Sequence, residues 1–496
     1  MTKQKDVHQS EYTTEVTLPT ADQEEEEDTL WQMSKNLFAV AVPIIVGQIF
    51  SLFIEMLNLV FAGHLGDPVF VAAAGLGNMY ANITCLLIIY GLNSAIATLC
   101  SQAYGSGNMR KCGIYLNKGR IAILLFFIPI TGITFLCESF LLMLRMDPET
   151  ARQAQIYTYG IVIALFFQAQ FDATRQYLNA LHKSSIITYI MIIASFLHFG
   201  VLYLLVIRMQ WGIVGASVGT IITYFFNSVV VTVYCMFQKD LKESFFFPTR
   251  ECFDDLWDYF RIGLPSSAMI SLEWWSFEIQ AILASYLSVV AVGSMVILVN
   301  TLTVLTMIPF GSQIAGAVFV GKSMGEGSAK RAKIYSKLIV FYTFLTCLIC
   351  AILLVVFRQQ VGLIFTDQKD LLDMTTENYK IIAVFLVIHG IGMATGGGLR
   401  GIGKQSTATK LVFAGFYFIG HPTSILLCFH AEMGLPGLLI GFCVGSIAMG
   451  VFFFINLTMF TDWEESAVQI RRKMRDNQHE QKDQVDNDNL KVNLLH

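Results

Sequence analysis

Residues 91–115 read GLNSAIATLCSQAYGSGNMRKCGIY, and residues 311–335 read GSQIAGAVFVGKSMGEGSAKRAKIY. The second stretch follows the first by 220 positions, and seven of the 25 aligned residues are identical, which is several times the chance level. The identical residues of the first stretch are Gly91, Ala95, Ala97, Gly105, Gly107, Ile114 and Tyr115. We infer that the chain contains two related halves.

Weaker echoes of this repeat extend along the chain, with an offset that drifts only from 220 to 226 positions. The matched pairs are Pro43 and Pro265, Leu178 and Leu399, Lys183 and Lys404, Ser185 and Ser406, Gly215 and Gly441, Val218 and Val444, and Gly219 and Gly445. The order of these pairs is the same in both halves. The repeat therefore covers most of the chain rather than one short motif.

The composition is that of a membrane protein. Of the 496 residues, 54% are hydrophobic and only 14% are charged, whereas soluble domains have about 25% charged residues. Apolar runs long enough to cross a bilayer as helices recur twelve times. We expect these spans at 37–61, 69–93, 121–144, 155–180, 186–207, 213–237, 262–286, 289–310, 338–357, 379–399, 410–430 and 435–459.

These spans predict an all-α membrane protein with twelve transmembrane helices in two six-helix bundles. Since six is an even number, both bundles have the same orientation, related by a pseudo-two-fold axis near the membrane normal, with a cavity between them. The expected organisation is an N-terminal bundle at 34–238, a cytosolic linker at 239–261 and a C-terminal bundle at 262–460. The acidic segment 1–33 and the polar segment 461–496 are expected to be disordered cytosolic tails.

Basic residues are distributed unevenly between the loops on the two sides. Loops after even-numbered spans hold 17 lysines and arginines, including Lys239, Lys330 and Lys404, whereas the loops on the other side hold six. The positive-inside rule therefore places both termini in the cytosol. The ten cysteines are scattered and indicate neither a disulfide framework nor a zinc site. We expect no metal and no cofactor.

Two carboxylates lie where carboxylates are energetically expensive. Glu273 and Glu278 are the only charged residues between Arg261 and Lys322, in the run SLEWWSFE at 271–278. An ionisable group near the bilayer centre costs roughly 2.5–3.5 kcal/mol on insertion scales, so it usually faces a polar cavity and handles a proton, an ion or a charged substrate. Both glutamates are candidate proton carriers, since burial favours the neutral form.

The aromatic neighbours Trp274, Trp275 and Phe277 suit flat or cationic ligands. Glu273 and Glu278 are five positions apart, about 140° around a helix. We therefore expect only one of them to point straight into a central cavity. The alternative for each is a structural, hydrogen-bonded carboxylic acid.

Further polar residues lie within other spans. Glu55 and Asn58 are candidates for a cation site in the N-terminal bundle, unless Glu55 merely pairs with a polar group such as Asn82. Gln48 and Asn82 are expected to line the cavity and contact substrate. Asp172 and Arg175, three apart on one helix face, are expected to pair. His198 is more simply a hydrogen-bonded structural residue than a functional one.

The chain resembles the eukaryotic branch of the multidrug and toxic compound extrusion (MATE) family over residues 34–460. The motifs that carry the resemblance are Glu273-Trp274-Trp275-x-x-Glu278, Gly63-His64-Leu65-Gly66, Ser101-Gln102-Ala103-Tyr104-Gly105 and Gly397-Gly398-Leu399-Arg400-Gly401-Ile402-Gly403. The family implies an antiporter, in which inward movement of H⁺ or Na⁺ drives export of organic compounds, often cations.

The chain departs from the family at two positions of the C-terminal half. Eukaryotic members often carry glutamates where this chain has Asn300 and His389. Asn300 can still bind substrate through hydrogen bonds. His389 titrates near the physiological range unless it is buried, so it either takes part in substrate release or is structural.

The leading hypothesis is a proton-coupled antiporter of organic cations or other amphipathic compounds, acting as a monomer in the plasma membrane or an acidic endomembrane. Na⁺ coupling and flipping of a lipid-linked substrate remain alternatives. No nucleophile–base or metal motif such as HExxH suggests an enzyme, and nothing suggests a nucleic-acid partner. A channel or receptor fits the duplicated plan less well.

Overall fold

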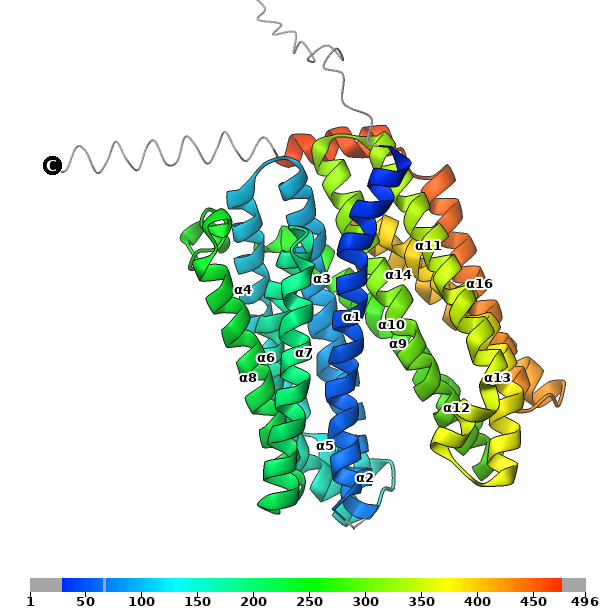
Figure 1. Ribbon diagram of the computed structural model, residues 1–496. Helices are drawn as coiled ribbons and strands as arrows, with labels where there is room; N and C mark the ends of the chain where they lie inside the picture. The colour runs from blue at the N-terminus through cyan, green and yellow to red at the C-terminus, as the bar shows by residue number, and fades with distance from the viewer. Residues whose placement is uncertain (1–28, 66–67, 475–496) are drawn as a thin grey trace, which may run out of the picture.

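The computed structural model describes residues 29–65 and 68–474, which are helical throughout, with no β-strand in these ranges. Twelve helical segments cross from one side of the molecule to the other (Figure 1). The N-terminal bundle consists of α1 (Leu30–Gly63), α2 with η1 and α3 (Pro68–Ala81, Asn82–Leu86, Leu87–Gly105), α4 (Met109–Thr134), α6 (Pro148–Ala180), α7 with η2 (Ser184–Leu202, Tyr203–Arg208) and α8 (Gly212–Phe237).

The C-terminal bundle repeats this plan. It consists of α9 (Leu256–Ala284), α10 (Val289–Glu326), α11 (Ala329–Val356), α13 (Lys369–Ile402), a span built from α14, η5, α15 and η6 (Gln405–Phe413, Ala414–Gly420, His421–Ile425, Leu426–His430) and α16 (Leu435–Met459). The short helices α5 (Cys137–Met143) and α12 (Arg358–Phe365) lie between spans. The expected twelve-helix, two-bundle fold is therefore confirmed.

Ten of the described spans are long and apolar enough to be recognised as membrane helices from composition alone. The other two, α6 and α9, contain charged residues within their helices. Those charges are Asp172 and Arg175 in α6, and Glu273 and Glu278 in α9. These two spans are thus less apolar than the ten that are recognised from composition.

Three boundaries differ from the expectation. Residues 30–33 belong to α1, because Thr29 caps its first turn by accepting a hydrogen bond from the Gln32 amide at 3.3 Å. Residues 463–474 form a helix rather than a disordered tail, because Trp463 and Ala467 pack into the C-terminal bundle. The linker 239–261 contains two short 3₁₀ helices, η3 (Lys239–Leu241) and η4 (Arg250–Cys252), and the first turns of α9. The rest of the predicted tails, 1–28 and 475–496, lies outside the described residues.

Contacts within the two bundles follow the repeat. Thr188 of α7 donates a hydrogen bond to the carbonyl oxygen of Pro43 at 2.6 Å, and Thr409 of α14 donates to that of Pro265 at 2.7 Å. Each proline lies inside the first span of its half, where it cannot donate a hydrogen bond to the carbonyl group four residues earlier. The same neighbouring span supplies the hydroxyl in both halves.

The two bundles meet closely at the end of the molecule where α1 begins and the red C-terminal helix lies (Figure 1). We call this end the basic side, because the lysine- and arginine-rich loops lie here. At this end α3 and α10 cross through glycines: a Cβ atom added at Gly105 would lie 2.0 Å from the carbonyl oxygen of Lys322, and one added at Gly325 would lie 2.0 Å from that of Gln102. These two contacts are equivalent under the 220-residue offset, so the repeated motif forms the junction between the bundles.

Hydrogen bonds reinforce this junction. Gln102 Nε2 donates to the carbonyl oxygen of Gly401 at 2.9 Å, and Thr98 Oγ1 donates to that of Arg400 at 3.1 Å. Gln405 Nε2 donates to Thr98 Oγ1 at 3.0 Å. Away from the basic side the two bundles diverge (Figure 1). This conformation is therefore closed on the basic side.

Candidate functional site

A cavity of about 360 Å³ lies between the two bundles. Helices α1, α2, η1 and α3 form one wall, and α9, α10 and α13 form the other. All but one of the residues predicted to handle protons, substrate or cations line it. They are Gln48, Glu55, Asn82, Glu273, Trp274, Trp275, Phe277, Glu278, Asn300 and His389.

Three carboxylates face this cavity. Glu55 comes from the N-terminal bundle, and Glu273 and Glu278 come from α9. Glu273 is buried, whereas Glu55 and Glu278 are partly exposed. Neither Glu55 nor Glu278 makes a hydrogen bond or ion pair with another described residue, so both carboxylates are available to a ligand.

The expectation that only one glutamate of α9 reaches the cavity was too strict, because both line it. The cavity extends around the side of α9, so residues about 140° apart both contact it. The two glutamates differ in the residues that share their face of α9. Glu273 shares its face with Gln280, which donates to Ser424 at 3.0 Å inside the C-terminal bundle, whereas Glu278 has no such neighbour.

The three aromatic residues of the α9 run differ in how far they are exposed and in what they pack against. Trp275 is exposed and Trp274 partly exposed. Phe277 packs edge-on against Phe442, with ring centroids 5.0 Å apart, and against Phe385 at 6.0 Å. Phe277 thus belongs both to the cavity wall and to the aromatic core of the C-terminal bundle.

His389 of α13 is bound to Glu273 of α9. The distance from His389 Nε2 to Glu273 Oε1 is 3.4 Å, and its Nδ1 atom lies 3.3 Å from Ser446 Oγ of α16. The imidazole stacks on Phe385, with centroids 4.9 Å apart and 21° between the planes. His389 is only 1% exposed. It therefore lines the cavity from behind the carboxylate of Glu273.

Asn58 is the exception among the predicted residues, since it does not line the cavity. It is buried on the far side of α1, where its Nδ2 donates to Thr220 at 3.0 Å. Its Oδ1 accepts from Thr220 at 3.2 Å and lies 3.2 Å from His198 Nε2. Glu55 therefore faces the cavity, whereas Asn58 lies on the opposite side of α1. His198 makes hydrogen-bond contacts inside the N-terminal bundle, as expected of a structural residue.

Asn300 and Asn82 occupy opposite walls. Asn300 of α10 is exposed, and its Nδ2 donates to the carbonyl oxygen of Val296 at 2.9 Å, which leaves its oxygen free to accept. Asn82 begins the π-helical segment η1 (Asn82–Leu86). π-helical turns in otherwise regular helices are common at functional sites.

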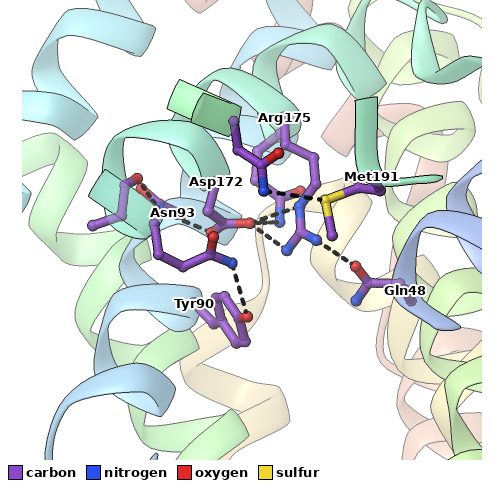
Figure 2. Close-up of polar contacts among 10 residues, drawn as sticks. Gln48, Tyr90, Asn93, Asp172, Arg175 and Met191 are labelled. Atoms are coloured by element: carbon purple, nitrogen blue, oxygen red, sulfur yellow. Dashed lines mark hydrogen bonds and ion pairs between the residues drawn. The ribbon is translucent and has the colours of Figure 1, made fainter. Parts of the chain in front are cut away.

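The predicted pair of Asp172 and Arg175 is confirmed and belongs to a larger polar cluster behind the N-terminal wall (Figure 2). Arg175 Nε donates to Asp172 Oδ1 at 2.9 Å. Asn93 Nδ2 donates to the other carboxylate oxygen at 2.8 Å, and Arg175 Nη1 donates to Gln48 Oε1 at 2.6 Å. Since Gln48 lines the cavity, this cluster holds its amide in place.

Sequence reasoning missed Tyr90, which lines the cavity and whose ring lies 5.6 Å from the Arg175 guanidinium carbon. The signal was available, because Tyr90 immediately precedes the first glycine of the repeat.

Sequence reasoning also missed the link from Arg400 Nη1 to Gln313 Oε1 at 2.7 Å in the other bundle. Gln313 occupies the position of Asn93 in the second half, so both halves use an amide to hold a buried charged side chain.

A comparison with known families explains the repeat. The MatE family model matches the chain twice, over residues 43–204 and 265–426. The chain belongs to the MATE family. The two matches are offset by 222 positions, which confirms the two halves found in the sequence. This MATE transporter therefore has one copy of the family unit in each bundle.

Relatives of known sequence support this assignment. Multidrug and toxin extrusion protein 2 of Mus musculus is 31% identical over 433 residues, which cover 87% of this chain and 75% of the mouse protein. Multidrug and toxin extrusion protein 1 of Homo sapiens is 27% identical over 441 residues, covering 88% and 76% respectively.

Solved structures share the fold. The eukaryotic MATE transporter AtDTX14 superposes with a TM-score of 0.86 at 24% identity, over 90% of this chain and 99% of that one. A multidrug resistance MATE family transporter of the MOP superfamily, solved in an outward-facing conformation, superposes with a TM-score of 0.79 at 17% identity, over 89% and 97%.

Proposed function

We propose that this MATE transporter is a secondary active antiporter that exports organic cations or other amphipathic compounds in exchange for protons, by alternating access. The observation that carries the proposal is the composition of the central cavity. It combines three carboxylates with two accessible tryptophans and no lysine or arginine among its lining residues. Such a cavity attracts cations and presents flat aromatic faces to them.

The exchange of a proton for an organic cation is explained if both compete for the same carboxylate. Glu273 is the main candidate for this role, and Glu278 is a second one. A proton on Glu273 removes the charge that holds the cation, so protonation releases substrate. A bound cation in turn disfavours protonation, which couples the two opposite movements.

Substrate contacts come from both walls. Trp274, Trp275 and Phe277 offer apolar and aromatic surface, while Gln48, Asn82 and Asn300 offer amide groups. Glu55 adds a negative charge on the N-terminal wall and is the candidate for a cation site there. Its partner in such a site is not Asn58, whose oxygen is already engaged by Thr220 and His198.

The basic side is proposed to face the cytosol, since the positive-inside rule places lysine- and arginine-rich loops there. The described conformation is then outward-facing, because the bundles touch on the basic side. It is the state that loads protons and releases substrate. The membrane is the plasma membrane or an acidic endomembrane, and the functional unit is the monomer, since each chain contributes both walls of the cavity.

The names of the two relatives described above favour the same function, because both are called multidrug and toxin extrusion proteins. Na⁺ coupling and flipping of a lipid-linked substrate are the alternatives that use the same cavity. Neither is favoured by a specific observation.

Reconstituted proteoliposomes test the proposal. Uptake of a fluorescent organic cation should require an imposed proton gradient and should stop when a protonophore collapses it. Uptake driven by a sodium gradient at equal pH would establish Na⁺ coupling instead. Loss of leaflet asymmetry of a fluorescent lipid-linked sugar, without cation transport, would establish the flippase alternative.

A further inference from the structure

A second, larger cavity lies on the outer face of the C-terminal bundle, away from the central site. It has a volume of about 1180 Å³ and is lined by α11, α13, α16 and residues 461–463. Helices α11 and α16 both pack on α13 but have little direct contact with each other. The space between them is therefore a groove with α13 as its floor, open toward the lipid.

We propose that this groove binds one phospholipid with a negatively charged headgroup, from the leaflet on the basic side. The groove runs along α11 from Lys333 to Phe344, which spans about 17 Å at 1.5 Å per residue. Half of a bilayer's hydrocarbon core is about 15 Å thick. The groove thus has the length of a single leaflet.

The outer end of the groove has the chemistry of a headgroup site. Lys333 and Lys337 lie one turn apart on α11, and the buried side chain of Trp463 forms part of the groove wall beside them. Lys337 is exposed, and in the described ranges no carboxylate pairs with it. Two lysines that converge on one end of a groove between membrane helices favour an anionic headgroup.

Two carboxylates lie near these lysines, and both are already engaged. Glu464 Oε1 lies 3.4 Å from Lys333 Nζ. Asp462 caps the helix at 463–474, where its Oδ1 accepts a hydrogen bond from the Glu465 amide at 3.0 Å. Lys337 is therefore the lysine at the headgroup end that has no carboxylate partner within the described ranges.

The remainder of the groove suits acyl chains. Its walls carry exposed apolar side chains that include Phe341, Phe454, Ile447 and Val451, with 45–63% of their surface accessible. The inner end stops at Ser446, which is fully buried and contacts His389 of the central site. Acyl chains that fill the groove would therefore end one residue away from the wall of the central cavity.

Native mass spectrometry of the purified full-length protein tests this site without using transport. Dioleoylphosphatidylserine and dioleoylphosphatidylcholine are titrated separately, and the affinity of the first lipid retained is measured. We expect phosphatidylserine to bind about fivefold more tightly, from the one lysine at the headgroup level that has no carboxylate partner in the described ranges. The double variant Lys333→Gln/Lys337→Gln should bind both lipids equally.

Two further variants complete the test. Lys330→Gln changes a lysine on the same helix that does not line the groove, and it should leave the preference intact. Val451→Trp fills the groove from its lipid-exposed wall, and it should weaken both lipids at least tenfold. Three results would each overturn the proposal. The unmodified protein could bind the two lipids equally, the Lys330→Gln control could lose the phosphatidylserine preference as the double variant does, or Val451→Trp could bind both lipids as tightly as the unmodified protein.

Discussion

The carboxylate of Glu273 and the imidazole of His389 lie 3.4 Å apart, on helices that are far apart in the sequence. Both side chains are buried, and the second imidazole nitrogen is engaged by Ser446. The pair therefore brings two titratable groups together in the wall of the central cavity. The charge on the His389 imidazole, neutral or positive, therefore affects how readily a cation can bind to the Glu273 carboxylate.

Replacement of Glu273 by Gln should abolish pH-dependent export while the protein still folds. The amide retains the shape and hydrogen-bonding capacity of the acid but cannot exchange a proton. The measurement is proton-driven uptake of a fluorescent cation into proteoliposomes, with thermal unfolding as the test of folding. Glu377→Gln on the exposed face of α13 is the matched control and should transport normally. Unchanged pH dependence in the Glu273→Gln protein would show that another residue carries the proton.

His389 is expected to tune cation release. His389→Gln removes an imidazole beside Glu273 that can accept a proton, so release into an acidic compartment should slow while binding at neutral pH changes little. His389→Glu places a second carboxylate against Glu273 and should tighten cation binding, since opposite charges attract strongly at low dielectric. Binding is followed by fluorescence titration at pH 7.5 and 5.5. Identical affinities and pH profiles in all three proteins would mean that His389 only supports the fold.

The glycines at the bundle junction should control the balance between the two transport states. In Gly105→Ala the new methyl group would meet the backbone oxygen of Lys322 at 2.0 Å, and in Gly325→Ala it would meet that of Gln102. Backbone atoms cannot rotate away, and overpacking of this kind costs about 1–3 kcal/mol. Each substitution should therefore shift the equilibrium roughly 5- to 150-fold toward a conformation that is open on the basic side.

Electron paramagnetic resonance distances across the basic side measure this shift. Spin labels at Lys239→Cys and Lys330→Cys report on the separation of the bundles. Nine of the ten native cysteines are buried, so Cys350 is the one that must also be replaced. Gly200→Ala is the control, because no atom lies within 4 Å of its added methyl group. A distance distribution that stays the same in all variants would exclude a role for these glycines in closure.

The helix at 463–474 should hold the basic side closed. Trp463 and Ala467 pack in the core of the C-terminal bundle, whereas Met474 is buried in that of the N-terminal bundle. Ile470 contacts both cores, and Lys111 Nζ of α4 donates to the carbonyl oxygen of Lys473 at 3.1 Å. Truncation after Asp462 should lower the unfolding temperature and widen the same spin-label distance.

Truncation after Met474 is the control for this helix, because it keeps all of the packed residues. It should behave as the full-length protein does. If both truncations have the same effect, the contacts of residues 463–474 do not hold the bundles together.

His182 is expected to make stability depend on pH. It lies in the loop between α6 and α7, and its ring packs edge-on against Phe319 of α10 with centroids 4.5 Å apart. Burial, assisted by the positive charge of Lys322, lowers the pKa of His182 to about 3. Between pH 6.5 and 3 the unfolded chain then binds more protons than the folded one at this residue. Stability therefore decreases as the pH falls below about 6.5, by at most about 1.4 kcal/mol per pH unit from this group.

His182→Asn should remove that part of the pH dependence, since asparagine is neutral and tolerates the positive φ of 58° at this position. The drop in unfolding temperature from pH 7.5 to pH 5.5 should become smaller than in the unmodified protein. His430→Asn, which changes an exposed histidine, should leave the drop as it was. An equal drop in the His182→Asn protein would place the pH dependence elsewhere.

The amino-acid sequence by itself determined the fold and the composition of the site. The apolar runs required twelve helices, because an unpaired backbone cannot cross a bilayer. The 220-residue repeat required two bundles of the same orientation. The carboxylates at 273 and 278 marked the cavity, because charges within a membrane are too costly to keep without a polar surrounding.

Only the tertiary structure decided which polar residues meet. Asn58 is three residues from Glu55, and spacing along one helix put both on a shared face. In the structure the side of α1 at Asn58 is filled by Thr220 and His198, which come from helices whose position no local pattern specifies. The contact between Glu273 and His389 depends in the same way on how α9, α13 and α16 pack. Local periodicity reports which residues must be buried, whereas the partner of each buried residue depends on packing between segments that are distant in the chain.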